Sequence, residues 1–319
     1  MIMNNIFKAI KDSKSIAITF HTSPDGDSLG SATALLQGLR ALNKNCYILS
    51  KETIPEVFRY LPFSDEITGE RFKVEEGTEL VIVLDCGDFK RINAEIEKEN
   101  REYTLINIDH HLSNELYGDY NFVDTNSSAV GEIIYQMLQL LGIKLNKEIG
   151  TSLYTSLLTD TGSFRHSNTT SVTHNIAGDI INTGLDFSEI HRTIFDNKKF
   201  HRVKLFGKVI DSMSLELNEN VVFMYITKGM IEDLGLENSD TSDVITYGTM
   251  IQGAEVVALI KESDEGVKVS LRSKNKIDVR SIAEQFNGGG HIRAAGFAFN
   301  GNINTIKKQL MEILEKELI

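Results

Sequence analysis

One histidine and two aspartates stand within seven residues in the segment HTSPDGDSLGS, residues 21–31. The run SIAITF, which is typical of a buried strand, comes directly before His21. A proline and a glycine bend the segment, so the carboxylates of Asp25 and Asp27 can converge. Close carboxylates repel each other unless a cation lies between them. An ordinary Asp-rich turn that caps a helix beginning near Ser28 explains this segment equally well.

Acidic and histidine side chains follow two more apolar runs. They are Asp85-Cys-Gly-Asp88 after ELVIVL, and Asp109-His110-His111 after TLINI. Each alone has an ordinary explanation, as a helix cap or a core histidine. Because the carboxyl ends of parallel strands meet at one edge of a sheet, we expect the three clusters to lie together. A fourth cluster around Asp160 closes a helical run, and is either a C-terminal turn or the last member of the group.

The residue types indicate a class of metal. Carboxylates and imidazoles without thiolates favour Mn²⁺ or Mg²⁺ ahead of a structural Zn²⁺. The candidate ligands are His21, Asp25, Asp27, Asp85, His110 and Asp160. These are too many for one ion that keeps a position open, and they suit two ions about 3.5–4 Å apart that share a carboxylate. Such a pair activates a water and stabilises in-line displacement at phosphorus.

Length and composition predict two folded domains. The chain has 319 residues, of which 41% are hydrophobic and 24% charged. Its net charge of −12 argues against a stable complex with long nucleic acid through a basic face. No apolar run reaches the ~20 residues of a membrane span, and the two cysteines are isolated, as in a reducing compartment. We therefore expect a cytoplasmic protein that does not associate with a membrane.

Strand-like and helix-like segments alternate in the first half of the chain. The runs SIAITF, CYILS, ELVIVLD and YTLINID are strand-like. Between them, SLGSATALLQGLRALNK, IPEVFRYL and KRINAEIEKENR show helical periodicity. This alternation predicts an α/β fold with a parallel sheet covered by helices.

The second half predicts a smaller α/β domain. Helical patterns run through residues 128–142 and 172–215. The strand-like runs VVFMYI, EVVALIKE, VKVSLRS and GFAFN follow, and the helix NTIKKQLMEILEKEL closes the chain. We place the first domain at residues 1–190, a helical linker at 191–210 and the second domain at 211–319, with the reaction in a cleft between the domains.

The ordered set HTSPDGD, VLDCGD, IDHH, LLTDTGSF and GGGHIRAAGF resembles the motifs of the DHH phosphoesterase superfamily, over essentially the whole chain. The compact length and the GGGH segment make the chain most similar to the NrnA-type subgroup. The resemblance implies an enzyme that hydrolyses very short oligoribonucleotides and, as many members do, 3′-phosphoadenosine 5′-phosphate (pAp). It also implies that the second domain is a DHH-associated, substrate-binding domain.

The resemblance implies a role for each candidate residue. Two groups of metal ligands follow from it: His21 with Asp25, and Asp27 with His110 and Asp160, joined by a bridging Asp85. His111 would lie near the scissile phosphate, as a donor to its oxygens or as a general acid, and Asp109 would orient its neighbours. The implied cofactors are two divalent ions, Mn²⁺ first and Mg²⁺ as the alternative.

The GGGH segment is the substrate-binding candidate of the second domain. It consists of Gly288, Gly289, Gly290 and His291. Residues without side chains let backbone N–H groups approach an anion, although a flexible loop explains the same pattern. Arg272 can hold a phosphate through two hydrogen bonds, but an exposed arginine at a strand end is also common. The resemblance favours phosphate binding. The loop SFRHSNTT, residues 163–170, either contacts a base or is a solvated connection.

The sequence leaves the substrate open among short RNA, pAp, the dinucleotide pApA and cyclic di-AMP. Pyrophosphate and polyphosphate, which other relatives hydrolyse, are disfavoured by the GGGH segment. A non-catalytic nucleotide-binding regulator with a dehydrogenase-like sheet is the alternative of another class, but the G-x-G-x-x-G motif is absent after the first strand. The expected partners are thus a short RNA, a dinucleotide or a nucleotide bisphosphate, and a homodimer is allowed.

Overall fold

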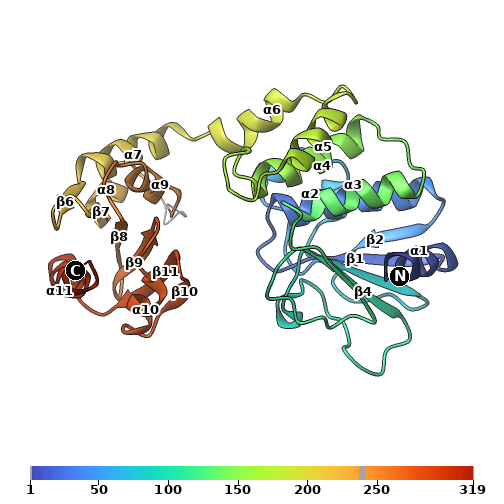
Figure 1. Cartoon of the computed structure of the whole chain (residues 1–319), viewed down its shortest axis with the longest axis horizontal. Coiled ribbons are helices and arrows are strands. Elements are labelled where there is room, and N and C mark those ends of the chain that lie inside the picture. The colour runs from blue at the N-terminus through green and yellow to red at the C-terminus, as the bar shows by residue number, and fades with distance from the viewer. Residues whose placement is uncertain (1, 237–241, 319) are drawn as a thin grey trace. The chain divides into compact units, whose positions relative to one another are not determined.

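The computed structural model describes residues 2–236 and 242–318, which form two compact units (Figure 1). The chain divides between Asn197 and Lys198. This point lies inside the segment 191–210 that the sequence analysis treats as a helical linker. Each unit has its own sheet and its own hydrophobic core.

The first unit contains a five-stranded parallel sheet in the order β2-β1-β3-β4-β5. Its strands are β1 (Ser15–Thr19), β2 (Asn45–Ile48), β3 (Leu80–Leu84), β4 (Thr104–Asp109) and β5 (Tyr120–Val123). The predicted parallel sheet is confirmed, although β5, which is only half-buried, was not expected from its short sequence. Because β1, β3 and β4 are neighbours in a parallel sheet, their carboxyl ends meet at one edge.

Helices lie on one side of this sheet, some of them packed on other helices rather than on the strands (Figure 1). They are α1 (Ile2–Asp12), α2 (Gly26–Ala41), α3 (Val130–Leu140), α4 (Lys147–Asp160), α5 (Ser171–Ile181) and α6 (Phe187–His191), which continues as a π-helix (Arg192–Asp196). Helix α2 is buried from Gly26 to Leu39, between the sheet, α3 and α4. Its small residues allow this close packing: a side chain at Gly30 would overlap the backbone of Ser152 in α4.

Two segments expected to be helices are irregular, so the helix expectation is wrong for both: IPEVFRYL packs into the core on the helical side of the sheet, and KRINAEIEKENR covers the opposite face. IPEVFRYL contains one 3₁₀ turn (Glu56–Phe58), and KRINAEIEKENR contributes only to the turn Phe89–Arg91. The backbone of the second segment instead bonds to neighbouring segments, as in Asn93 N–H to the Phe20 carbonyl at 2.8 Å. Ile92 and Ala94 alternate into the core of this face. Tertiary hydrogen bonds thus override a weak helical pattern.

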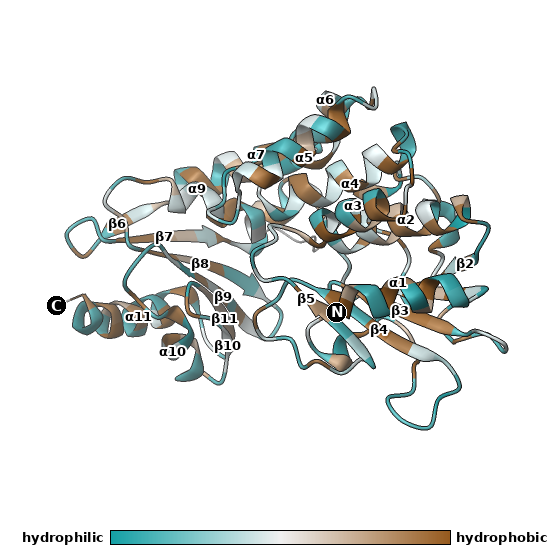
Figure 2. Cartoon of the chain, turned by 45° about the vertical axis from the view of Figure 1, so that its right-hand side comes forward, coloured by the Kyte–Doolittle hydropathy of each residue, from teal (hydrophilic) through white to brown (hydrophobic). Residues whose placement is uncertain are grey.

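The second unit contains a mixed six-stranded sheet in the order β10-β11-β9-β8-β7-β6. Its strands are β6 (Ser214–Glu216), β7 (Val221–Ile226), β8 (Val256–Ser263), β9 (Gly266–Ser273), β10 (Gly289–His291) and β11 (Ala294–Phe299). Its helices are α7 (Phe200–Asp211), α8 (Lys228–Glu232), α9 (Ile245–Thr249), α10 (Val279–Glu284) and α11 (Ile303–Glu317). Alternate residues of β7 enter different cores: Phe223 packs toward α11 and Met224 toward α7. Figure 2 shows the apolar side of α11.

Three residues of the GGGH segment form a strand, so the alternative of a flexible loop does not hold for them. Gly289, Gly290 and His291 form β10, which pairs with β11 in antiparallel register. A side chain at Gly290 would overlap the backbone of Ala294, so close strand approach explains that glycine. No helix in the described part of the chain has the length and apolar character needed to cross a membrane.

Gly30→Ala should destabilise the first unit by about 1–3 kcal/mol, because the added methyl group forces α2 away from α4. Gly178→Ala is the matched control: it lies in helix α5, and an added Cβ meets no atom within 4 Å. The control should be neutral or stabilising by up to about 1 kcal/mol. Urea unfolding of both variants measures the difference, and equal stability would contradict the packing argument.

Candidate active site

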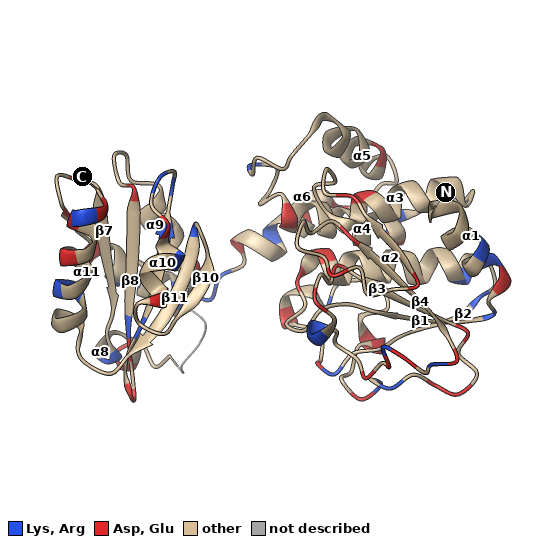
Figure 3. Ribbon diagram, turned by 60° about the horizontal axis from the view of Figure 1, so that its bottom comes forward, with Lys and Arg blue, Asp and Glu red and all other residues tan. Residues whose placement is uncertain are grey.

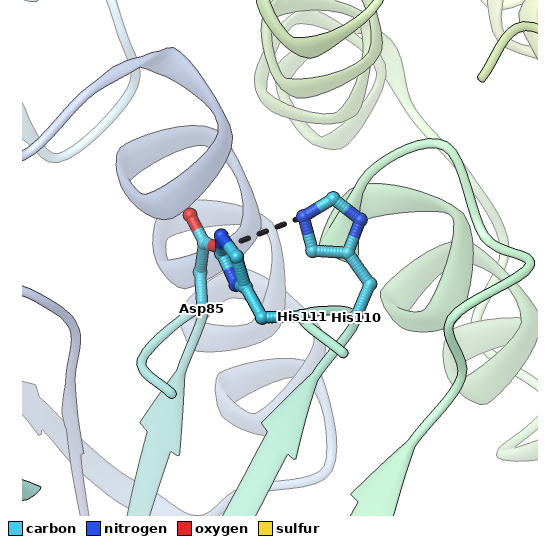
Figure 4. A group of neighbouring side chains, drawn as sticks. All are labelled: Asp85, His110 and His111. Atoms are coloured by element: carbon cyan, nitrogen blue, oxygen red, sulfur yellow. Dashed lines mark ion pairs between the residues drawn. The ribbon is translucent and has the colours of Figure 1, made fainter. Parts of the chain in front are cut away.

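Three neighbouring strands bring the acidic and histidine clusters together. His21 follows β1, Asp85 follows β3, and Asp109 ends β4 with His110 directly after it. Figure 4 shows Asp85, His110 and His111 at the ends of two adjacent strands, with Asp85 and the histidines facing one another. The shared sheet edge expected from the sequence is therefore present, and it carries a group of side chains that could hold cations.

Asp85 lies at the centre of the group. Its Oδ2 is 3.4 Å from His21 Nε2, and its Oδ1 is 3.8 Å from His110 Nε2. The residue has φ of +52°, a left-handed conformation that aspartate tolerates better than most side chains. Its side chain is 3% exposed, and Oδ1 has no hydrogen-bond partner among the described residues. A buried carboxylate oxygen without a donor is rare, and a bound cation would satisfy it.

Two groups of ligand atoms lie on either side of this carboxylate. The first is His21, Asp25 and Asp85, and the second is Asp27, His110 and Asp160; within each group the atoms are within 4.8 Å of one another. In the second group, His110 Nε2 is 3.9 Å from Asp27 Oδ2 and 3.8 Å from Asp160 Oδ2. All six side chains selected from the sequence are thus brought together.

Both histidines of these groups are oriented by backbone carbonyls. His21 Nδ1 is 2.9 Å from the Thr22 carbonyl oxygen, and His110 Nδ1 is 3.0 Å from that of Ser127. With Nδ1 donating, the lone pair of each Nε2 faces the carboxylates. This is the usual arrangement of metal-binding histidines.

Asp25 has both roles that the sequence left open. It is the N-cap of α2, where its Oδ1 accepts hydrogen bonds from the N–H groups of Asp27 at 3.1 Å and Ser28 at 3.0 Å. The same carboxylate oxygen is 3.6 Å from His21 Nε2. Capping the helix and belonging to the cluster are therefore compatible.

Asp27 is held by the N-terminus of another helix. Its Oδ2 accepts from Val130 N–H at 2.8 Å and its Oδ1 from Gly131 N–H at 3.2 Å, in the first turn of α3. The N-cap of α3 is Ala129, which has no capping side chain, so Asp27 supplies the missing acceptor. Ser31 and Ser156 also donate to Oδ1, at 3.1 and 2.5 Å. Sequence reasoning missed these two serines, since serines occur throughout such helices.

Two asparagines that the sequence analysis did not select position other members. Asn114 Nδ2 donates to Asp109 Oδ2 at 2.5 Å. Asn168 Nδ2 donates to the backbone carbonyl of Asp160 at 3.2 Å and is 3.4 Å from its Oδ2. Asn114 lies five residues after Asp109 in the same loop, and Asn168 lies in the loop 163–170 that was interpreted as a base contact or a solvated connection.

Asp109 and His111 form a pair beside the cluster. Asp109 is fully buried and accepts a hydrogen bond from His111 Nδ1 at 2.8 Å. The side chain of His111 is 49% exposed, so its other nitrogen is open to solvent. The bond to Asp109 raises the pKa of His111 above its ordinary value. Hydrogen bonds from His111 and Asn114 more than offset burial and lower the pKa of Asp109.

Crowded carboxylates dominate the electrostatics of the site. Burial and the nearby charges of Asp85 and Asp160 raise the pKa of Asp27. Burial also raises the pKa of Asp160, to about 6. For His21, burial lowers the pKa, but contacts with Asp25 and Asp85 outweigh it and raise the value to about 10. Each shift has the direction expected of anionic groups held together without a compensating cation.

A cavity of about 420 Å³ opens beside the cluster, within the first unit. Four members of the cluster line it: His21, Asp25, Asp85 and Asp160. His111 and Asp88, which belong to the predicted clusters, line it as well. The other lining residues Arg91, Ser113 and Glu115 had no predicted role at the site. Basic and acidic residues are otherwise interspersed over both units (Figure 3).

The substrate-binding candidates of the second unit are close to one another. The register pairs Arg272 of β9 with Ala294 of β11, and Ala294 with His291 of β10. Arg272 and His291 therefore lie in one cross-strand row, on the same face of the sheet. Arg272 is partly buried, and burial lowers its pKa. In the loop 163–170 of the first unit, Phe164 stacks on His174 with ring centroids 5.3 Å apart.

Comparisons with known proteins identify the family of the chain. Residues 15–159 match the family described as "DHH family, N-terminal domain", and residues 218–316 match the "DHHA1 domain". Two relatives are named "Bifunctional oligoribonuclease and PAP phosphatase NrnA". The one from Thermus thermophilus is 30% identical over 99% of this chain and 94% of its own. The one from Bacillus subtilis is 32% identical over 86% of each chain.

A solved structure shares the fold. It is described as an exopolyphosphatase-related protein from Bacteroides fragilis, is 25% identical, covers 99% of this chain and 96% of its own, and gives a TM-score of 0.89. The architecture of both units is thus one already seen in an experimental structure.

Asp109→Asn should lower the pKa of His111, because the hydrogen bond to a charged carboxylate that favours the imidazolium is lost. The measurement is an NMR titration of the histidine ring protons in the presence of a chelator. Asp88→Asn is the matched control, since this carboxylate lines the same cavity without a hydrogen bond to His111. An unchanged His111 titration in Asp109→Asn would contradict the assigned pair.

Proposed function

The chain belongs to the DHH family, and on that premise we propose that it is a metal-dependent phosphoesterase that hydrolyses very short oligoribonucleotides to mononucleotides and dephosphorylates pAp. The names of the Thermus thermophilus and Bacillus subtilis relatives support this substrate class. The observation that carries the proposal is the position of Asp85. Its Oδ2 faces His21 and its Oδ1 faces His110, and Oδ1 has no hydrogen-bond donor within the described part of the chain.

The donor set fits two divalent cations. His21, Asp25 and Asp85 would hold one, and Asp27, His110, Asp160 and Asp85 the other, with Mn²⁺ preferred and Mg²⁺ as the alternative. Cys86 is near but supplies no thiolate, because burial raises its pKa to about 12. When bound, the two ions would neutralise phosphate oxygens and make a water nucleophilic at neutral pH.

His111 would act on the substrate directly. Asp109 fixes its Nδ1 and favours the protonated ring, which leaves the Nε2 proton available on the exposed side. That proton can be donated to a non-bridging phosphate oxygen or transferred to the leaving oxygen. Asp109 stays ionised and buried, so its role is to orient and charge the imidazole.

The second unit would bind the nucleotide. The row of Arg272 and His291 offers a guanidinium and an imidazole beside exposed glycine backbone. Arg272 Nη1 donates to the Leu271 carbonyl, and no ion pair of Arg272 is found among the described residues. A guanidinium without an ion pair among the described residues is suited to a phosphate. We propose that Arg272, Gly288, Gly289, Gly290 and His291 form this part of the substrate site.

The function is tested by product release from 5′-labelled RNAs of two, five and twenty-four nucleotides, beside pAp, pApA and cyclic di-AMP. We expect hydrolysis of the shortest RNAs and of pAp in Mn²⁺, little cleavage of the longest RNA, and no activity after chelation. A strong preference for pApA or cyclic di-AMP would move the protein to dinucleotide turnover. Tight nucleotide binding without any turnover would support the regulator alternative and overturn the proposal.

Asp85→Ala should abolish hydrolysis because it removes a ligand from both ions. Asp85→Asn is the sharper test, because asparagine keeps the size and tolerates φ of +52°. We expect kcat/KM to fall more than about 100-fold, with Mn²⁺ affinity reduced at both sites and the circular dichroism unchanged. Asp88→Asn, in the same loop, should remain near wild type. Activity that survives Asp85→Asn would contradict the shared carboxylate.

Binding of Mn²⁺ should release protons at pH 7. In the metal-free chain His21, with a pKa of about 10, is protonated at this pH, and the ion needs its neutral form. The affinity for Mn²⁺ should therefore rise as the pH is raised from 6 to 8. Titration calorimetry in two buffers of different ionisation enthalpy counts the protons, and an identical heat in both buffers would contradict the assignment of His21.

A further inference from the structure

The cavity beside the metal-ligand cluster contains one residue with a permanent positive charge. Its lining carboxylates are Asp25, Asp85, Asp88, Glu115 and Asp160. Arg91 is the only lysine or arginine in the lining of this cavity. An arginine among so many acidic groups would ordinarily be found in an ion pair, yet none is present for Arg91 among residues 2–236 and 242–318. The guanidinium is exposed and available to a ligand.

The backbone of Arg91 is fixed beside the metal ligands. Arg91 ends the 3₁₀ turn that begins at Phe89, and its N–H donates to the Asp88 carbonyl at 3.0 Å. Its own carbonyl accepts from Thr22 N–H at 2.7 Å, and His21 forms a β-bridge with Ile92. The arginine is therefore tied to the loop that carries His21, which sets where its side chain can reach.

Lys90, the residue next to Arg91 in the chain, does not line the cavity that contains the metal-ligand candidates. Lys90 is also exposed and basic, but it lines a different cavity of about 520 Å³, together with Phe89 and Glu95. Two consecutive basic residues thus serve separate cavities, and one of these cavities contains the candidate metal ligands. Lys90 is consequently a matched control for the loss of one positive charge from this turn.

The charge balance of the site leaves a role for this cation. Four carboxylates belong to the two ligand groups: Asp25, Asp27, Asp85 and Asp160. When ionised, they carry as much negative charge as two divalent cations carry positive charge. An incoming phosphate would add negative charge to a neutral centre, beside the further carboxylates of Asp88 and Glu115. Beside His111, a donor with a permanent positive charge would offset this added charge, and a guanidinium can hold two phosphate oxygens at once.

We propose that Arg91 binds the non-bridging oxygens of the phosphate group that enters this cavity, and so determines the affinity for phosphorylated nucleotides. This inference rests on the proposed phosphoesterase function and names the residue that recognises its substrate class. His111 lines the same cavity and would contact the same group. Arg91 belongs to the first unit and would act independently of Arg272 in the second.

The test compares the binding of 5′-AMP and adenosine to the Mn²⁺-loaded protein by titration calorimetry. The variants are Arg91→Ala, Arg91→Lys and the control Lys90→Ala. In wild type, the phosphate should make AMP bind more tightly than adenosine. Arg91→Ala should reduce this advantage about 10- to 100-fold, which corresponds to about 1.4–2.8 kcal/mol. Arg91→Lys should be intermediate, because an ammonium group lacks the planar fork.

Three further measurements separate this inference from the proposed function. Mn²⁺ stoichiometry and adenosine affinity should be unchanged in Arg91→Ala, and Lys90→Ala should bind AMP as wild type does. An AMP advantage that is absent in wild type, or equal in wild type and Arg91→Ala, would overturn the role of Arg91. If the advantage depends on Arg91 but wild type hydrolyses none of the RNA and nucleotide substrates, the proposed function fails while the phosphate contact stands.

Discussion

Mutual repulsion of buried carboxylates is the constraint on which this site depends. Asp27 and Asp85 are almost completely buried, and Asp160 and the helix-capping Asp25 lie close to them. Burial and like charges raise the pKa of Asp27 and of Asp160. Hydrogen-bond donors nevertheless surround the carboxylate of Asp27, whereas one oxygen of Asp85 has no donor among the described residues. An arrangement of this kind is stable in its ionised form only with cations, which is the physical basis for a metal-dependent enzyme.

The fold supplies the donors through close helix packing. Helix α2 is lined with small residues, so α4 approaches near enough for Ser156 to donate to Asp27. The first turn of α3 has no side-chain cap of its own and directs two amides at the same carboxylate. Backbone carbonyls orient both Nε2 atoms inward. The contacts that pack the helices therefore also position the candidate metal ligands. A substitution deep in α2 would disturb the site from a distance.

Much of the site was predictable because its residues follow buried strands at fixed positions. The motif around Asp109 stands directly after an apolar run, and parallel strands force such ends together. Asn114, Asn168 and Arg91 were not predictable, because their importance arises from contacts with residues distant in the fold or from the cavity they line. The extended segment around Ile92 was mistaken for a helix for a related reason: its backbone hydrogen bonds go to other segments. In the GGGH segment, where a flexible loop was the alternative to an anion site, Gly289–His291 form strand β10 because glycines allow the close approach of β11.

The central claim is that Asp85 lies between two cations. Anomalous diffraction from crystals grown with Mn²⁺, recorded at the manganese absorption edge, tests it most directly. The account predicts two anomalous peaks about 3.5–4 Å apart, one toward His21 and one toward His110, each within bonding distance of a different oxygen of Asp85. A single peak, or two peaks that do not both contact Asp85, would contradict it.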